Sequence, residues 1–187
     1  MDYIYKDFLL TAGMLAQEQL AYSYTGNLSR RWKNNLFITR TGANLRNLSK
    51  EDIIVLPLDK KSILESRASS ELIVHKSILK SSGKKAVLHT HPIYTVKLSF
   101  NSDVIIPKDS EGKAILGSVP VLEVEKPTAS IELAKILSEV LKEKKVAVIR
   151  GHGVFAVESS LFKAYEVVSI LENSCKILWR CQNGGKS

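Results

Sequence analysis

Two short apolar segments of the chain end in histidines, and a fold for this sequence has to accommodate both. Segment 86–91 is predicted to be a buried strand that finishes with His89 and His91. Side chains alternate between the two faces of a strand, so these imidazoles project from the same face. His152 lies between two glycines, soon after the apolar strand 146–149. Glycines at such a point let the backbone turn sharply or approach another group closely.

Three neutral imidazoles are typical of a catalytic zinc ion, because they leave one position open for water or substrate. A lone His-x-His pair also occurs in cores and on surfaces, but the glycine-flanked His152 and the motif Ser69-Ser70-Glu71 favour a metal site. Glu71 is the expected carboxylate beside the ion, since its helix leads into the histidine strand. His75, four residues later in that helix, is interpreted as a packing residue rather than a ligand.

The hydrophobic periodicity predicts alternating helices and strands. The predicted helices cover residues 3–19, about 69–80, a segment opened by Pro92, 130–142 and 160–180. The predicted strands cover residues 28–32, 36–40, 53–58, 86–91, 119–124, 146–149 and 154–157. Segment 101–116 is expected to be loop-rich. We predict a single layered α/β domain over residues 1–187, with a frayed tail at 182–187, and antiparallel pairing where 28–32 and 36–40 form a hairpin.

Three loops of small residues interrupt the first half of the chain, at 26–29, 41–44 and 68–71. Such loops expose backbone N–H groups and hydroxyls that suit a phosphate group. Ser69 or Ser70 is predicted to cap the helix that follows, with Glu71 in its first turn, which adds the positive end of the helix dipole. Together with the metal motif, these loops favour a phosphorylated substrate.

Composition and charge exclude several classes of protein. The 187 residues carry a net charge of +8, but the basic residues occur in dispersed pairs, so we expect no nucleic-acid partner and instead a field that attracts small anions. No apolar run is long enough to cross a bilayer, and the first residues do not resemble a signal peptide. Cys175 and Cys181 lie on one predicted helix and cannot face each other. We therefore expect a cytoplasmic protein without membrane contact.

The motifs and their order resemble those of the class II aldolase and adducin head family. The matching segments are Gly26-Asn27-Leu28-Ser29, Thr41-Gly42, Ser69-Ser70-Glu71, His89-Thr90-His91-Pro92 and Gly151-His152-Gly153-Val154. They are spread over nearly the whole chain. The resemblance implies a three-layer α/β/α fold around a central, largely antiparallel sheet. It also implies a homotetramer with active sites at subunit interfaces.

The resemblance also implies roles for individual residues. One zinc ion per subunit would be held by His89, His91 and His152, with Glu71 as fourth ligand in the empty site and as catalytic acid/base once substrate displaces it. The family's phosphate-binding positions correspond to Gly26, Asn27, Thr41, Gly42, Ser69 and Ser70. The expected reaction is reversible cleavage of a ketose 1-phosphate, such as L-fuculose 1-phosphate, into dihydroxyacetone phosphate and a small aldehyde such as lactaldehyde.

The chain departs from the family's aldolases on the aldehyde side of the reaction. A bacterial aldolase of the family carries a tyrosine about twenty residues after the second metal histidine, whereas segment 106–112 here contains none. Asp109 and Glu111 in this segment are interpreted as residues of a solvated surface loop. A C-terminal tyrosine is also expected to be missing. The aldehyde partner and its stereochemistry are therefore left open.

Other functions compatible with the same residues stay open. A pentulose-phosphate 4-epimerase or a methylthioribulose-1-phosphate dehydratase would use the same fold. An adducin-like interaction domain would keep the fold without the metal residues, so the presence of His89, His91, His152 and Glu71 argues against it. A Schiff-base aldolase would need a buried lysine, and no predicted buried strand supplies one.

Overall fold

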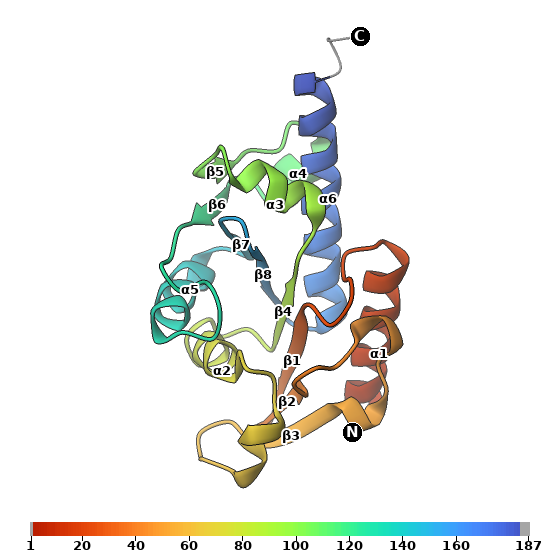
Figure 1. Ribbon diagram of the computed structural model, residues 1–187, viewed down its shortest axis with the longest axis vertical. Helices are drawn as coiled ribbons and strands as arrows, with labels where there is room; N and C mark the ends of the chain where they lie inside the picture. The colour runs from red at the N-terminus through yellow and green to blue at the C-terminus, as the bar shows by residue number, and fades with distance from the viewer. Residues whose placement is uncertain (1, 184–187) are drawn as a thin grey trace.

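The computed structural model describes residues 2–183 and consists of one mixed sheet with helices on both faces (Figure 1). The eight strands follow the order β3-β2-β1-β4-β8-β7-β6-β5. Neighbouring strands are antiparallel except for β6 and β7. The strands are β1 (Asn27–Trp32), β2 (Asn35–Thr39), β3 (Ile53–Pro57), β4 (Ala86–Thr90), β5 (Val104–Ile105), β6 (Val119–Leu122), β7 (Val146–Ile149) and β8 (Gly153–Glu158). The predicted hairpin is confirmed as β1 and β2.

Six α-helices cover the sheet along the described part of the chain. They are α1 (Asp2–Gln17), α2 (Leu72–Ser81), α3 (Ile93–Ser99), α4 (Ser110–Ile115), α5 (Ile131–Glu143) and α6 (Leu161–Asn183). Short 3-10 turns at Leu45–Asn47, Lys50–Asp52 and Ile63–Arg67 connect the elements of the first half. Helices α2 and α5 pack against each other on one face of the sheet, and α1 and α6 lie on the other (Figure 1).

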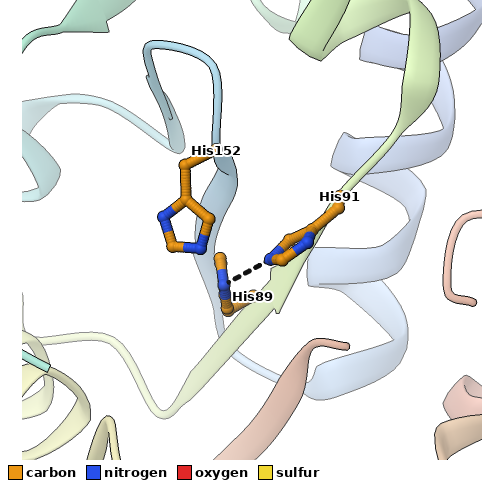
Figure 2. Close-up of side chains that lie close together, drawn as sticks. All are labelled: His89, His91 and His152. Atoms are coloured by element: carbon orange, nitrogen blue, oxygen red, sulfur yellow. Dashed lines mark hydrogen bonds between the residues drawn. The ribbon is translucent and has the colours of Figure 1, made fainter. Parts of the chain in front are cut away.

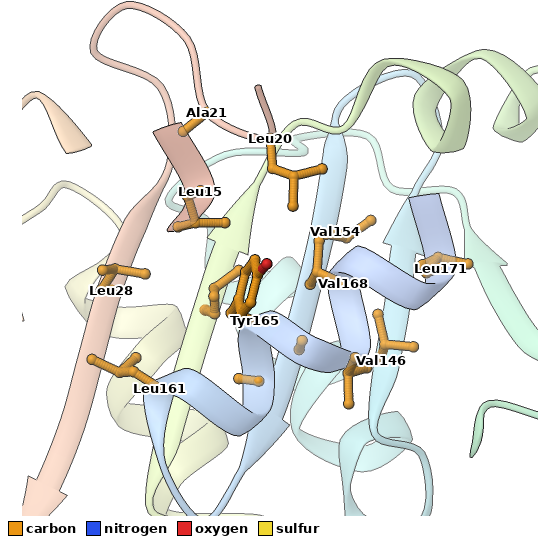
Figure 3. Close-up of a cluster of buried hydrophobic side chains, with 14 of the residues drawn as sticks. Leu15, Leu20, Ala21, Leu28, Val146, Val154, Leu161, Tyr165, Val168 and Leu171 are labelled. Atoms are coloured by element: carbon orange, nitrogen blue, oxygen red, sulfur yellow. The ribbon is translucent and has the colours of Figure 1, made fainter. Parts of the chain in front are cut away.

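The alternation of side chains along each strand divides the core into two layers. In β7, Val146 and Val148 join the cluster beneath α1 and α6, whereas Ala147 and Ile149 join the cluster beneath α2 and α5. Figure 3 shows the first layer, in which Tyr165 and its neighbours on α6 pack on the strands. Strands that are apolar on both faces require helices on both sides, and the predicted three-layer α/β/α architecture is confirmed.

Two local predictions need correction. Segment 101–116 was expected to be loop-rich, but it contains β5 and α4, which are too short for a periodic sequence pattern to reveal. Neither Ser69 nor Ser70 caps α2, because Glu71 occupies the N-cap position and the helix begins at Leu72. The Ser69 hydroxyl instead accepts a hydrogen bond from the Glu71 amide within the preceding turn, at 3.3 Å.

The predicted frayed tail, 182–187, falls only partly within the described residues. Helix α6 continues to Asn183, so the backbone of 182 and 183 is helical, and residues 184–187 lie outside the described residues. Both cysteines are free, as the sequence predicts, and on α6 Cys175 is buried whereas Cys181 is exposed. None of the helices in the described part combines the length and hydropathy that a bilayer span requires.

A buried carboxylate fixes the start of α3, the helix that follows the histidine strand. Glu172 on α6 is 4% exposed and accepts hydrogen bonds from the backbone N–H groups of Tyr94 and Thr95, at 3.0 and 2.9 Å. The Thr95 hydroxyl donates to the same carboxylate at 2.9 Å. The first N–H groups of a helix lack partners within the helix, so Glu172 acts as an N-terminal cap supplied from another element.

We predict that Glu172→Ala lowers the free energy of unfolding by about 2–3 kcal/mol, because it leaves buried donors at the start of α3 without an acceptor. Glu172→Gln keeps an acceptor oxygen and should lose less. Glu139→Ala, at an exposed position on α5, serves as the control and should change stability little. Urea unfolding of the three variants gives the comparison, and equal losses for Glu172→Ala and Glu139→Ala would contradict the capping role.

Candidate metal centre and active site

The candidate site forms where three chain segments meet at one end of the central strand β4. Strand β1 runs antiparallel to β4 and pairs Asn27 with His89. Strand β8 pairs with the other edge of β4 and places Phe155 opposite His89. The start of β1, the end of β4 and the turn between β7 and β8 therefore lie side by side. His152 lies in the turn between β7 and β8, so this pairing places it beside the two histidines of β4.

The three predicted histidines form a compact cluster (Figure 2). One ligand nitrogen from each of His89, His91 and His152 lies within 4.8 Å of the others. The Nε2 atoms of His89 and His91 are 2.9 Å apart. The ring centroids of His152 lie 4.9 Å from His89 and 4.7 Å from His91. The sequence prediction that these residues come together is confirmed.

Hydrogen bonding and stacking orient the ring of His89. Its Nδ1 lies 2.9 Å from the Val154 carbonyl oxygen, which can only accept, so Nδ1 carries the proton. The Nε2 lone pair of the neutral ring then points into the cluster. The ring also stacks on Phe155, with centroids 4.1 Å apart and an interplanar angle of 14°. Histidines that bind a metal ion through one nitrogen usually donate the other ring N–H to a carbonyl or carboxylate in this way.

The electrostatics of the cluster suit metal ligation. Burial lowers the pKa of His89 and of His91 to about 3, and it also lowers the pKa of His152. All three rings are therefore neutral at neutral pH, which is the state that binds zinc. Three converging neutral imidazoles, each offering one nitrogen to the same point, fit a divalent metal ion.

Two glycines allow the backbone to pass close to the histidines. A Cβ atom on Gly153 would lie 2.6 Å from both His91 Cδ2 and the Thr90 carbonyl oxygen. A Cβ atom on Gly26 would lie 2.7 Å from the carbonyl oxygen of His89, and Gly26 has a φ of +83° that disfavours other residues. The spacing of strands around the cluster thus depends on the absence of side chains at these positions.

Glu71 reaches the cluster from the start of α2. It is 4% exposed, and its Oε2 lies 3.6 Å from His89 Nε2. The same oxygen accepts a hydrogen bond from Asn27 Nδ2 at 3.3 Å. Burial raises the pKa of Glu71, although His152 and the Asn27 amide act in the opposite direction. A carboxylate at this distance can approach a metal ion held by the histidines or exchange a proton with a bound substrate.

Every residue predicted for the site lines one cavity of about 200 Å³. The metal side comprises Glu71, His89, His91 and His152. The predicted phosphate-binding residues on its walls are Gly26, Asn27, Thr41, Gly42, Ser69 and Ser70. Three separate loops therefore converge on the cluster. Which of these residues bind metal or phosphate stays a prediction.

The loops differ in how freely their polar groups can meet a ligand. The Ser69 hydroxyl is occupied by the Glu71 amide, and the Thr41 amide donates to the Arg67 carbonyl at 3.0 Å. By contrast, neither the Gly42 amide nor the Ser70 hydroxyl has a hydrogen-bond partner among residues 2–183. Gly42 also has a φ of +67°, a conformation that glycine adopts without strain.

Sequence reasoning missed five residues of the cavity wall, which are Tyr24, Thr25, Arg40, Ala43 and Thr128. Arg40 is the most informative of them, because it brings a positive charge beside the predicted phosphate loops. Its Nε donates to Asp52 at 2.7 Å, and Nη1 donates to the Thr41 carbonyl at 3.0 Å. Its position next to Thr41-Gly42 is a signal that could have indicated it.

Two further predictions concern residues outside the cavity wall. Asp109 was interpreted as a loop residue, but its side chain caps α4 by accepting a hydrogen bond from the Gly112 amide at 2.8 Å. Glu111 follows in the first turn of that helix. His75 is fully buried in α2 and makes an edge contact with Phe155, as expected for a packing residue.

Comparison with known proteins identifies the family. The model of the class II aldolase and adducin N-terminal domain matches residues 6–179. The chain belongs to this family. An L-fuculose phosphate aldolase of Methanococcus maripaludis is 26% identical over 178 residues, which covers 95% of this chain and 97% of the relative. The crystal structure of L-fuculose-1-phosphate aldolase from Thermus thermophilus superimposes with a TM-score of 0.93 at 32% identity, covering 100% of this chain and 98% of that one.

The class II aldolase relationship supports an aldolase-type lyase, although relatives differ in the reaction they are named for. A 3-oxo-tetronate 4-phosphate decarboxylase of Haemophilus influenzae is 28% identical over 164 residues, covering 84% of this chain and 78% of the relative. These names share a phosphorylated substrate.

We predict that Gly153→Ala weakens zinc binding by about 10- to 100-fold, because the new methyl group would displace His91 and the end of β4. The affinity can be measured by competition with a chromophoric chelator. Gly13→Ala in α1 is the matched control, since a Cβ atom there has nothing within 4 Å, and it should bind zinc normally. Wild-type affinity in the Gly153 variant would contradict the close-packing argument.

Proposed function

We propose that the protein is a zinc-dependent aldolase that reversibly cleaves a ketose 1-phosphate, similar to L-fuculose 1-phosphate, into dihydroxyacetone phosphate and a small aldehyde such as lactaldehyde. The supporting observation is the convergence of the histidine cluster, Glu71 and three small-residue loops on one cavity. A metal site and an anion site within one small cavity suit a substrate that carries a carbonyl group and a phosphate a few bonds apart.

Zinc, one ion per subunit, would be held by His89, His91 and His152, with Glu71 as a fourth ligand before substrate binds. When bound, zinc supplies a Lewis acid that polarises the substrate carbonyl and stabilises negative charge on its oxygen. The neutral histidines leave the positive charge of the ion undiminished, and burial of the cluster strengthens that charge's effect on substrate.

The phosphate would bind in the loops on the other side of the cavity. The unpartnered Gly42 amide and Ser70 hydroxyl provide donors, and the Arg40 guanidinium provides charge. Asn27 and Thr41 complete the wall nearest the histidines. Fixing the phosphate orients the neighbouring carbon atoms toward Glu71, which converts proton transfer into a step between positioned groups.

Glu71 would move the proton in the carbon–carbon cleavage. Glu71 would take the proton of the 4-hydroxyl group as the aldehyde carbonyl forms, while the C3–C4 bond breaks and its electron pair passes to the three-carbon fragment that bears the phosphate. Glu71 would then return this proton to C3, which completes dihydroxyacetone phosphate. The carboxylate is held near this position by the Asn27 amide and by its place at the start of α2.

We further propose that the protein works as a homotetramer with active sites at subunit interfaces. Support comes from the rim of the cavity, where Tyr24 is 68% exposed although it lines the site. Tyr22 beside it is 50% exposed and makes an edge contact with His91, with ring centroids 6.2 Å apart. Exposed aromatic side chains beside a catalytic cavity suit burial against a second subunit.

We predict that removal of metal with EDTA abolishes the activity and that zinc restores it. The assay is a screen of ketose 1-phosphates with detection of dihydroxyacetone phosphate and of the released aldehyde. If the product is instead epimerised or dehydrated, or if carbon dioxide is released from an acid substrate, the site catalyses another reaction and aldol cleavage is wrong. Activity that persists in EDTA, with borohydride trapping of dihydroxyacetone phosphate on a lysine, would overturn the metal mechanism.

We predict that Glu71→Gln keeps zinc bound through the three histidines but slows proton exchange on dihydroxyacetone phosphate by about 10²- to 10⁴-fold, because the amide cannot transfer the proton. Exchange is measured by NMR from the loss of the proton signal in deuterium oxide. Glu65→Gln, on a partly exposed carboxylate paired with Lys76 outside the cavity, is the matched control. Full exchange activity in the Glu71 variant would remove this residue from the mechanism.

A further inference from the structure

A chain of buried polar groups leads from the interior of α2 to the carboxylate of Glu71. His75 Nδ1 lies 2.6 Å from Ser29 Oγ, and His75 Nε2 makes a short hydrogen bond with Asn27 Oδ1. The other end of the same amide, Asn27 Nδ2, donates to Glu71 Oε2 at 3.3 Å. Ser29 and His75 are fully buried, and Asn27 is 9% exposed. Packing of His75 in the core would not by itself require this connected series of hydrogen bonds.

The acceptor at Glu71 determines the direction of every hydrogen bond in the chain. The Asn27 amide donates from Nδ2 to Glu71 Oε2, so it presents its oxygen to His75. The amide oxygen can also only accept, so His75 Nε2 must carry the proton. His75 Nδ1 is then a bare acceptor for the Ser29 hydroxyl. Burial lowers the pKa of His75 to about 3, which is consistent with a neutral ring that has one N–H group.

The position of these residues follows from the fold. Asn27 and Ser29 are two residues apart on β1 and therefore face the same side of the sheet, toward α2. His75 lies one helical turn after Glu71 in α2, and its backbone N–H donates to the Glu71 carbonyl at 3.1 Å. The four polar side chains thus come from two facing surfaces, one on β1 and one at the start of α2.

We propose that His75 is a positioning residue for Glu71, acting through Asn27. By donating to Asn27 Oδ1, His75 fixes the amide in the orientation that offers its NH₂ group to the carboxylate. Without that donor the amide can rotate and present its oxygen to Glu71, which would push the carboxylate out of place. The catalytic consequence rests on the proposed function of Glu71 as acid/base, whereas the hydrogen-bond order itself does not.

The hydrogen-bond order is tested in the metal-free protein, without any assay of activity. Nitrogen chemical shifts of the His75 ring at neutral pH should show protonated Nε2 and unprotonated Nδ1. Ser29→Ala removes the donor to Nδ1 and should shift that nitrogen's resonance while the ring stays neutral. A ring with its proton on Nδ1 in the wild-type protein would overturn the proposal, because Asn27 would then face Glu71 with its oxygen.

The catalytic part is tested with two substitutions of His75. His75→Leu removes the donor and should lower kcat by about 10- to 100-fold with little change in KM, because substrate still binds to zinc and to the phosphate loops. His75→Gln is the conservative control, since its amide can donate to Asn27 Oδ1 from nearly the same place, and it should recover most of kcat. Thermal unfolding and zinc content of both variants separate positioning from loss of fold.

A double-mutant cycle identifies the route through Asn27. If His75 acts through this amide, Asn27→Ala and the double variant His75→Leu/Asn27→Ala should have the same kcat within about twofold, a sign of non-additivity between coupled residues. Additive losses would overturn the route, as would an unchanged kcat in His75→Leu. Should His75→Leu fail to fold, an equal kcat loss in His75→Gln and in Asn27→Ala would overturn the proposal, and recovery in His75→Gln would support it.

The results can reject the positioning role of His75 and the proposed function independently of each other. If the wild-type protein cleaves no ketose phosphate, the proposed function fails while the tautomer of His75 and the orientation of Asn27 still decide the hydrogen-bond order. If cleavage depends on Glu71 but not on His75, the proposed function stands and the positioning role is lost.

Discussion

The register of the central strand β4 is the constraint on which the site depends. His89 faces Asn27 across one edge of this strand and Phe155 across the other. If β1 or β8 shifted by one residue relative to β4, every side chain of the shifted strand would turn to the opposite face of the sheet. Such a shift would take Asn27 away from Glu71. In β1, Leu28 packs in the core layer beneath α1 and α6, and a one-residue slip would put a polar neighbour in its place. The hydrophobic core thus sets the geometry of a polar cavity.

Burial gives the histidine cluster its chemical character. Three imidazoles held together in water would titrate near their ordinary pKa, but here burial keeps them neutral. Neutral rings with converging nitrogens leave lone pairs that need a proton or a metal ion. The absence of a side chain at Gly153 makes the cluster possible, since a methyl group there would occupy the space between β4 and β8. The close packing of β8 against β4 therefore sets the distances between the candidate ligands.

The sequence predicted much of the fold and the residues of the cavity, because local patterns determine both. Period-two apolar runs indicate strands, and glycine-flanked histidines indicate close approach. The start of α2 was predicted wrongly, since Glu71 competes with the serines for the N-cap position. The hydrogen bonds of His75 could not be predicted from the sequence either. Its partners Asn27 and Ser29 lie more than forty residues away in the sequence, and only the pairing of α2 with β1 brings them together.

The residues that line the cavity come from only part of the chain. This separates two parts of the proposed chemistry, which are the cleavage of the bond and the recognition of the departing fragment. The residues predicted for metal, phosphate and proton transfer come from the elements around β4, and no residue of segment 92–127 lines the cavity. That segment forms α3, β5, α4 and β6, and α3 and α4 pack against α6. Relatives named for aldol cleavage and for decarboxylation can therefore share the first part, since both reactions leave an electron pair beside a carbonyl group. Under the proposed function, the second part, recognition of the departing fragment, is left to the exposed rim of the cavity at Tyr24.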